Sequence, residues 1–234
     1  MPGTPKAIRP LTDAQIKTRT GKTWDQWFET LDKFCGVEKG RREIGYTLHG
    51  KPGVDGWLST VIVVEYEAAR NVLEPDGRPK GYTVCVTRTI VAPVAAAYAA
   101  WSTDAGWNTW FAKKSKVDLK VGGRYSTASG DAGEFTRITD GKAIEFTWEN
   151  PKHKPGTLVE AAFKPKGIGN DKCVVTVSHE RIQTRAEADD LKDAWTGVLT
   201  TLKKVLEKQH PRAEKPPRVR DDNPRPRRGR AGSS

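Results

Sequence analysis

Apolar and polar residues alternate in short runs between residues 82 and 183, a period typical of strands with one buried face. The first run, YTVCVTRTI at 82–90, predicts a strand whose Tyr82, Val84 and Val86 share that face. The next segment, VAPVAAAYAAW, predicts a helix entered through Pro93, since proline fits the first turn of a helix. Turns rich in Gly, Asp, Asn and Pro then separate six further predicted strands, at about 116–120, 123–129, 133–139, 143–149, 157–164 and 172–182.

The period changes to that of a helix after residue 183. Thr184 and Glu187 have the spacing of a capping box, in which two side chains satisfy backbone donors at the helix start. At ~1.5 Å per residue, a helix running to about residue 208 is more than ~30 Å long and can lie across a whole sheet. The pattern therefore predicts an α+β fold in which a long C-terminal helix grips a curved antiparallel sheet. The apolar residues at three- to four-residue spacing are Leu191, Trp195, Val198, Leu199, Leu202, Val205 and Leu206.

The N-terminal part shows a different pattern, made of short helices. Thr12 with Gln15, and Thr23 with Gln26, fit two further capping boxes. Two more helices, at about 41–49 and 54–70, follow on either side of GKPG, so this part is predicted to be a small helical bundle. The apolar face of its second helix is formed by Trp24, Trp27, Phe28, Leu31 and Phe34.

Two changes of composition divide the chain. LEPDGRPKG at 73–81 holds two prolines and two glycines, and is predicted to link the two folded parts. From Pro211 onward, proline, arginine and glycine replace apolar side chains, so this segment cannot bury enough surface to offset its chain entropy. The predicted organisation is a disordered segment at 1–11, a helical bundle at 12–72, a linker at 73–81, a helix-grip domain at 82–210 and a disordered basic tail at 211–234.

The basic tail holds eight Lys and Arg against three Asp and Glu, and so carries +5 of the net charge of +11. Such a tail offers non-specific electrostatic binding to nucleic acid, with a strong salt dependence. The alternative is a solvated tail that only aids solubility. The candidate polyanion-binding residues are Arg218, Arg220, Arg225, Arg227, Arg228 and Arg230.

Two helices joined by a tight turn also describe a helix-turn-helix, which would read DNA through its second helix. Here that helix is predicted to expose Glu65 and Glu67 in place of a row of Arg, Asn or Gln. Residues 1–80 carry a net charge of only +2, from 13 basic and 11 acidic residues. The sequence therefore disfavours DNA reading by the helical bundle.

Several kinds of site have no support in the sequence. Cys35, Cys85 and Cys173 form no CxxC or Cys/His spacing, so we predict no metal site, no disulfide and three buried thiols. No motif indicates a cofactor. No apolar run approaches the ~20 residues of a membrane span, and the N-terminus lacks an apolar stretch of signal-peptide length. We therefore expect no membrane span and a cytoplasmic location.

Successive segments of the second part carry a resemblance: APVAAAYAAWSTDAGWNTWF, VDLKVGGRYS, GEFTRI, IEFTWE, VTVSHE and AWTGVLTTLKKVL. Their order over residues 81–208 resembles the START-like (SRPBCC) superfamily, in the branch named for the activator of heat-shock-protein-90 ATPase. The resemblance implies a helix-grip fold with a cavity between the sheet and the C-terminal helix, which relatives use for lipids, polyketides or hormones. Eukaryotic co-chaperones of this branch carry a different N-terminal domain. Here residues 12–70 instead resemble an uncharacterised helical family that often precedes START-like domains.

The resemblance places WSTDAGWNTWF, residues 101–111, at a helical corner beside the cavity mouth. Indoles bury large areas and keep one N–H donor, which suits the wall of a pocket. Two alternatives for these tryptophans are plain core packing and base stacking, the latter with only Lys113, Lys114 and Lys116 as basic neighbours. The predicted ligand-binding residues are Trp107, Trp110, Phe135, Phe146, Trp148, Val177, His179, Trp195 and Leu199.

The main functional hypothesis is non-catalytic binding of a small apolar or amphipathic molecule in this cavity. A second hypothesis is a protein-interaction or chaperone-associated scaffold whose tail holds polyanions. A third is a hydrolase or cyclase that uses His179 inside the cavity, as some relatives do. No Ser/His/Asp or Cys/His set is evident, and Glu145 and Glu149 lie ~13 Å apart along one strand face, too far for an acid/base pair. The sequence therefore leans away from an enzyme.

Overall fold

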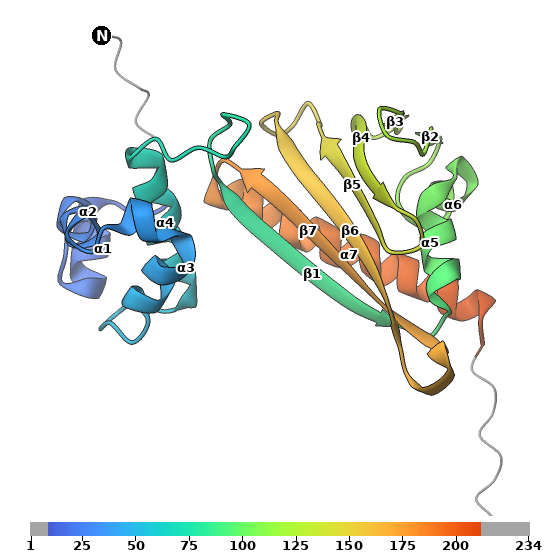
Figure 1. The fold of residues 1–234 in the computed structure, drawn as a ribbon, viewed down its shortest axis with the longest axis horizontal. Coiled ribbons are helices and arrows are strands. Elements are labelled where there is room, and N and C mark those ends of the chain that lie inside the picture. Colours follow the sequence, from blue (N-terminus) through green and yellow to red (C-terminus); the bar gives the residue numbers. More distant parts are fainter. Residues whose placement is uncertain (1–8, 212–234) are drawn as a thin grey trace, which may run out of the picture.

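A computed structural model describes residues 9–211 of the chain. Within these residues, the C-terminal part is one seven-stranded antiparallel sheet in the order β1-β7-β6-β5-β4-β3-β2, and a long helix crosses one of its faces (Figure 1). The predicted α+β fold, a meander of strands closed by a helix, is confirmed. The strands are β1 (Tyr82–Ile90), β2 (Lys116–Val117), β3 (Arg124–Ser126), β4 (Ala132–Thr139), β5 (Ala143–Trp148), β6 (Thr157–Lys166) and β7 (Lys172–Ile182).

The face of the sheet toward the long helix, here called the inner face, is set by side-chain alternation along the strands. β5 and most of β7 are buried at every second residue, including Phe146 and Trp148 on β5 and His179 on β7. Val159 of β6 pairs with Phe146 on one side and with His179 on the other, so these three side chains share the inner face. The register therefore gathers the aromatic residues of three strands on the side that the helix covers.

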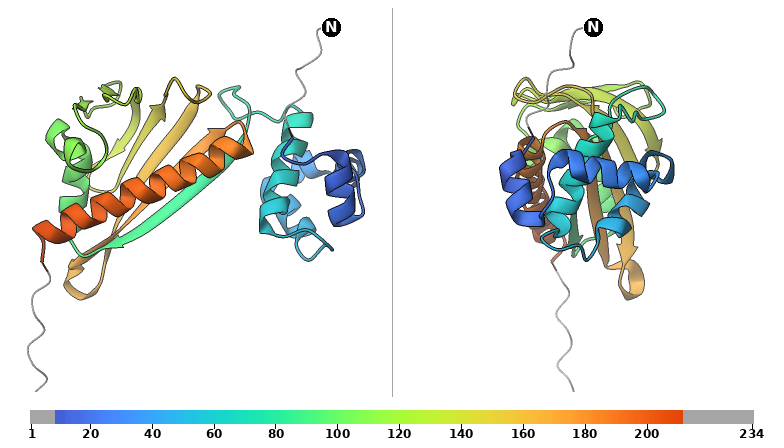
Figure 2. Two further views of the ribbon diagram at one scale, coloured as in Figure 1. Left: turned by 180° about the vertical axis from the view of Figure 1, so that it is seen from behind. Right: turned by 90° about the vertical axis from the view of Figure 1, so that its left-hand side faces the viewer.

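The long helix is α7 (Arg185–Gln209), which runs diagonally along the inner face (Figure 2). Thr184 caps it as predicted, because its hydroxyl oxygen accepts a hydrogen bond from the backbone N–H of Glu187 at 3.2 Å. With 25 residues the helix is about 37 Å long, enough to span the sheet. Its buried side chains form one stripe at helical spacing: Ala188, Leu191, Trp195, Leu199, Leu202 and Leu206.

Two short helices, α5 (Val94–Ser102) and α6 (Asp104–Trp110), connect β1 to β2, and a single 3₁₀ turn, η1 (Ile168–Asn170), lies between β6 and β7. Thr103 caps α6 by accepting a hydrogen bond from the backbone N–H of Gly106 at 3.0 Å. A side chain at Gly106 would meet the Ala100 carbonyl oxygen at 2.5 Å, so glycine lets α6 fold back closely on α5. This corner brings three tryptophans together beside the sheet.

Among the described residues before the linker, four helices form a bundle. Both predicted capping boxes are present, at Thr12 and Thr23. The third helix begins five residues earlier than predicted, and Gly40 interrupts it with a φ of 82°. The fourth is buried continuously from Val61 to Glu67, so it is the central helix of the bundle. The bounds are α1 (Asp13–Thr20), α2 (Trp24–Lys33), α3 (Gly36–Leu48) and α4 (Gly56–Ala69).

Glu65 and Glu67 of α4 are buried, which corrects the prediction that this helix exposes them. They lie where the bundle meets the linker and β1. The Tyr82 hydroxyl donates to Glu65 Oε1 at 3.4 Å, and Arg41 Nε donates to Glu67 Oε2 at 2.9 Å. Arg41 also donates to the carbonyl of Gly81 at 3.0 Å. The prediction was wrong because a helix in isolation does not reveal that another part of the chain covers its polar face.

Candidate functional site

A pocket of about 240 Å³ lies between α7, the end of β5 and the turn that follows α6. Three aromatic rings form much of its wall, from Phe111, Trp148 and Trp195. The rings of Phe111 and Trp195 stack at 25° with their centroids 5.8 Å apart. The remaining lining residues are Ser129, Asp131, Leu191, Ala194 and Val198. The site is therefore an aromatic and aliphatic pocket with a short polar edge.

The α7 side of the pocket follows from helical spacing. Leu191 lies three residues before Ala194 and four before Trp195, and Val198 follows these two at four and three residues, so the four side chains form one stripe along the helix. The apolar stripe in the sequence contained Leu191 and Val198, but small Ala194 gave no signal. It is solvent-exposed at the pocket edge, where a larger side chain would narrow the opening.

Polar groups from the β3–β4 turn form the opposite edge. Asp131 Oδ2 accepts hydrogen bonds from Ser129 at 2.8 Å and from Thr127 at 3.1 Å. Its other carboxylate oxygen accepts from the side-chain amide of Asn150 at 2.8 Å. These bonds hold the carboxylate in place beside the aromatic walls, where it can accept a further hydrogen bond from a ligand. Sequence reasoning missed this edge, because no pattern links the turn to α7.

The three tryptophans of the 101–111 segment are core residues. Trp101, Trp107 and Trp110 are 0%, 1% and 5% exposed. The indole N–H of Trp107 donates to the carbonyl of Trp101 at 2.7 Å, and that of Trp110 donates to the carbonyl of Ala100 at 2.9 Å. Both donors are therefore used by the backbone, and neither ring is open to a base or a ligand. Core packing, one of the two alternatives, describes this cluster best.

Apart from His179, the predicted ligand-binding residues divide into two groups. Trp148 and Trp195 line the pocket. Behind them, the structure brings a second group together in the closed core without a place in the pocket wall: Trp107, Trp110, Phe135, Phe146, Val177 and Leu199. Aromatic rings thus fill much of the space that the resemblance assigned to a cavity, and the pocket lies at the edge of this packed core.

His179 lies directly behind the pocket. Its Nδ1 accepts a hydrogen bond from the indole N–H of Trp195 at 3.0 Å, and its ring meets Trp148 edge-on at 5.1 Å. Burial, with a smaller effect from nearby His153, lowers the pKa of His179 to about 3, so the imidazole is neutral at physiological pH. Because Nδ1 is an acceptor, the proton belongs on Nε2, which has no partner among the described residues.

This arrangement determines what His179 can do. The lone pair of its neutral ring is already occupied by Trp195, so the ring is a hydrogen-bond donor and not a base as it stands. It holds the Trp195 indole at a fixed angle against the pocket. Through this hydrogen bond, His179 is linked to the pocket by way of Trp195.

The structure also bears on the predictions about metal sites, membrane spans, cysteines and the basic tail. Within residues 9–211, no group of His, Cys, Asp or Glu is arranged to hold a metal ion. No helix among those residues is long and apolar enough to cross a membrane. Cys173 is buried but Cys35 and Cys85 are exposed, which corrects the prediction of three buried thiols. The polyanion-binding candidates of the tail lie outside the described residues: Arg218, Arg220, Arg225, Arg227, Arg228 and Arg230.

Comparison with known proteins supports this fold and gives it a family. The solution structure of CalU16 from Micromonospora echinospora has a TM-score of 0.51 and 19% identity, over 60% of this chain and 73% of that one. An Hsp90 activator from Plasmodium falciparum has a TM-score of 0.46 and 20% identity, over 54% of this chain and 96% of that one. A comparison with curated protein sequences gave no match.

The family described as Activator of Hsp90 ATPase homolog 1-like protein matches residues 91–207, half of the 234-residue chain. The matched segment runs from the end of β1 through the α5–α6 corner and all of β2 to β7, and ends in the last turns of α7. It thus contains the whole pocket. On this match, and with the fold described above, the chain belongs to the activator of Hsp90 ATPase homolog 1-like family.

Proposed function

We propose that the chain binds a small, mainly apolar molecule carrying one hydrogen-bond donor in the pocket between the sheet and α7. The observation that carries this proposal is the meeting of Phe111, Trp148 and Trp195 around one opening. Aromatic walls with a few fixed polar groups are the usual composition of small-molecule sites. A planar ligand would lie against these rings.

The pocket also limits the size and polarity of its ligand. Its volume of about 240 Å³ is below the ~300–1,000 Å³ of sites for drug-sized molecules, so the ligand is small or leaves part of itself outside. Asp131 and Ser129 provide an acceptor and a hydroxyl at one edge. A hydroxyl or amine on the ligand would pair with this edge, while the ring system faces α7.

The first experiment is native mass spectrometry of the chain purified from its own host, compared with the mass after denaturation. A bound molecule of discrete mass is the expected result, and it would name the ligand. The second is a titration of the labelled protein with 2-naphthol, a planar probe with one hydroxyl, followed by NMR at the indole N–H of Trp195. A saturable shift of this signal is expected.

Blocking the opening tests the location. Ala194→Trp places an indole at the pocket edge and should abolish the 2-naphthol shift without unfolding the protein, since Ala194 is exposed. Lys204→Trp adds the same side chain to an exposed position of α7 away from the pocket, and should bind as the wild type does. Undiminished binding by Ala194→Trp would place the ligand elsewhere and defeat the proposal.

The family match favours a protein partner as the second candidate function. In this alternative the helix-grip part contacts an Hsp90-type chaperone, and the basic tail adds affinity for polyanions. Measuring the chaperone's ATPase rate with and without the chain tests the proposed chaperone contact. Deleting residues 211–234 tests the proposed polyanion affinity of the tail, since the deletion should remove most of the affinity for RNA and its salt dependence. An unchanged ATPase rate and an unchanged RNA affinity would leave pocket binding as the function.

A further inference from the structure

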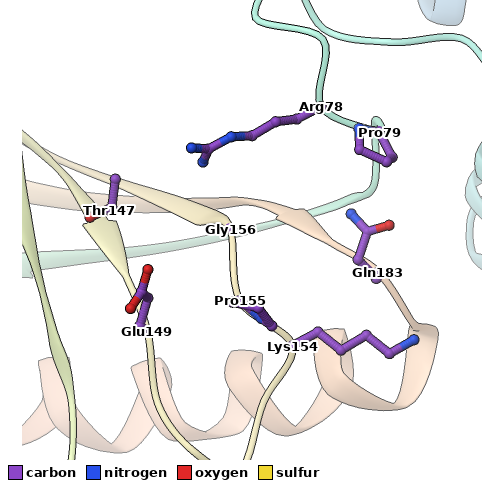
Figure 3. Close-up of a pocket in the computed structure, with 8 residues that line it drawn as sticks. All are labelled: Arg78, Pro79, Thr147, Glu149, Lys154, Pro155, Gly156 and Gln183. Carbon is purple, nitrogen blue, oxygen red and sulfur yellow. The ribbon is translucent and has the colours of Figure 1, made fainter.

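A second cleft among the described residues opens on the other side of the sheet from α7. It has a volume of about 550 Å³, within the range of small-molecule sites. Thr147, one of its lining residues, alternates with the inner-face residues Phe146 and Trp148, and so it points to the outer face. Figure 3 shows the cleft with the linker on one side and the end of β5 on the other. It shares no lining residue with the pocket at α7.

The linker wall of this cleft is anchored. Asp76 Oδ2 forms an ion pair with Arg181 Nη1 at 2.8 Å, and this pair ties the linker to the end of β7. The Asp76 carboxylate also accepts a hydrogen bond from the backbone N–H of Arg78 at 3.2 Å. Because the wall is held by these contacts, the cleft exists before any ligand enters. A preformed site binds without the cost of ordering a loop.

Arg78 crosses the cleft from the linker toward the sheet (Figure 3). A methyl group at Gly156 would lie 4.0 Å from Arg78 Nη1, so the guanidinium lies over the Gly156 backbone. Gly156 has a φ of +94°, a conformation that favours glycine, and the absence of a side chain leaves the space below the guanidinium open. The only described carboxylate oxygen near Arg78 belongs to Asp76 and lies 3.9 Å from Nε. Among the described residues, the two terminal nitrogens of Arg78 have no hydrogen-bond partner, so they can bind a ligand.

Charge and shape of the lining indicate the ligand class. Arg78 and Lys154 provide two positive charges against one negative charge, from Glu149. None of the ion pairs within 4 Å among the described residues involves Lys154 Nζ. Pro79 and Pro155 add rigid apolar surface from the two sides. Guanidinium groups bind carboxylates and phosphates through paired hydrogen bonds, and apolar surface suits an aliphatic or aromatic body.

We infer that this outer-face cleft is a second binding site, for a small amphipathic anion with a carboxylate or phosphate group on an apolar body. The anionic group pairs with Arg78, and the apolar body lies between Pro79 and Pro155. Such a ligand touches the linker and the sheet at once. It therefore fastens the linker, and through it the helical bundle, to the helix-grip part.

An NMR titration of the ¹⁵N-labelled full chain tests this inference with three probes: octanoate, octyl phosphate and octylammonium. The two anions should shift the backbone amides of Thr147 and Gly156 and the side-chain amide of Gln183 in a saturable way. The tighter of the two anions then names the head group. Octylammonium should give no saturable shift at these positions. Binding of octylammonium as tightly as the anions, or no saturable shift with any probe, would overturn the inference.

Variants locate the anion. Arg78→Gln should weaken binding of the tighter anion by about tenfold or more, because it removes a charge-assisted pair of hydrogen bonds. Lys154→Gln tests the opposite wall and should give a smaller loss. Lys142→Gln, at the other end of β5, is the matched control and should bind normally. So should Ala194→Trp, which narrows only the pocket at α7. If both Arg78→Gln and Lys154→Gln bound the anion with wild-type affinity, the proposed site in this cleft would be wrong.

Discussion

The indole N–H of Trp195 on α7 donates a hydrogen bond to Nδ1 of His179 on β7, across 3.0 Å. Both side chains are buried, at 4% and 0% exposure, so water cannot replace either partner. One side of the Trp195 residue faces the pocket, while its N–H is turned toward the sheet. The bond therefore connects the geometry of the pocket to the interior of the protein, and it determines the tautomer of His179.

Replacing Trp195 by phenylalanine should lower the free energy of unfolding by about 1–3 kcal/mol beyond the loss of ring area, because Nδ1 of His179 loses its donor in a buried site. Urea unfolding measures this. In a double-mutant cycle with His179→Leu, the two costs should sum to more than the cost of the double variant. Strict additivity would show that the bond contributes nothing to stability.

The pKa of His179 predicts how stability depends on pH. Burial lowers this pKa to about 3 in the folded protein, from 6.5 in the unfolded chain. As pH falls below 6.5, the unfolded chain binds a proton that the folded protein does not, so acid favours unfolding. Between about pH 6 and pH 4, this group alone should remove about 1.4 kcal/mol of stability per pH unit.

Urea unfolding at pH 7, 6, 5 and 4 checks this slope. His179→Gln, which cannot titrate, should give a shallower slope than the wild type over this range. Exposed His49 is the matched position, and His49→Gln should keep the wild-type slope. If the three proteins share one slope, His179 is not held neutral by burial.

Arg41 is predicted to hold the linker to the helical bundle. It donates to Glu67, whose side chain is 4% exposed, and to the Gly81 carbonyl. Without Arg41, the nearest cation to Glu67 is Lys80, at 3.9 Å. Arg41→Ala should therefore destabilise the bundle by about 1–3 kcal/mol and speed hydrogen exchange of the linker amides, because a buried carboxylate loses its donor.

The neighbouring residue provides a control for that prediction. Arg42 is exposed, and its described contact is a 3.4 Å hydrogen bond to the Tyr46 hydroxyl. Arg42→Ala should leave linker exchange and proteolysis at residues 73–81 unchanged. Equal exchange rates in Arg41→Ala and the wild type would mean that the linker is held by other contacts.

The three cysteines should differ in reactivity. Cys35 and Cys85 are exposed, whereas burial raises the pKa of Cys173 to about 11 and keeps its thiol protonated. Iodoacetamide at pH 8 should therefore add two labels to the folded protein, and a third only in denaturant. Intact mass counts the labels. Three labels at one rate in the native protein would contradict the burial of Cys173.

The extent of agreement between sequence and structure differs by type of feature. The capping boxes at Thr12 and Thr23 formed in full. At Thr184 the N-cap hydrogen bond formed, but the Glu187 carboxylate accepts from the Thr184 hydroxyl and the Lys154 backbone N–H. The strand ranges agree to within a few residues except at the short β2 and β3. These features depend on neighbours a few positions apart, so the local pattern contains the information. Exposure of Glu65 and Glu67 was predicted wrongly, because it depends on contacts with Tyr82 and Arg41, 17 and 26 residues away.

The same distinction applies to the candidate site. By itself, the sequence determined the fold, the apolar stripe of α7 and the aromatic residues that surround its inner face, since side-chain period and residue type express them directly. Only the tertiary structure decided that Trp107 and Trp110 close the core while Trp148 and Trp195 border an opening. It alone placed Asp131 at the pocket and Arg78 over Gly156. A pocket is the volume that packing leaves unfilled, and that volume depends on side chains brought together from distant segments, which no local pattern records.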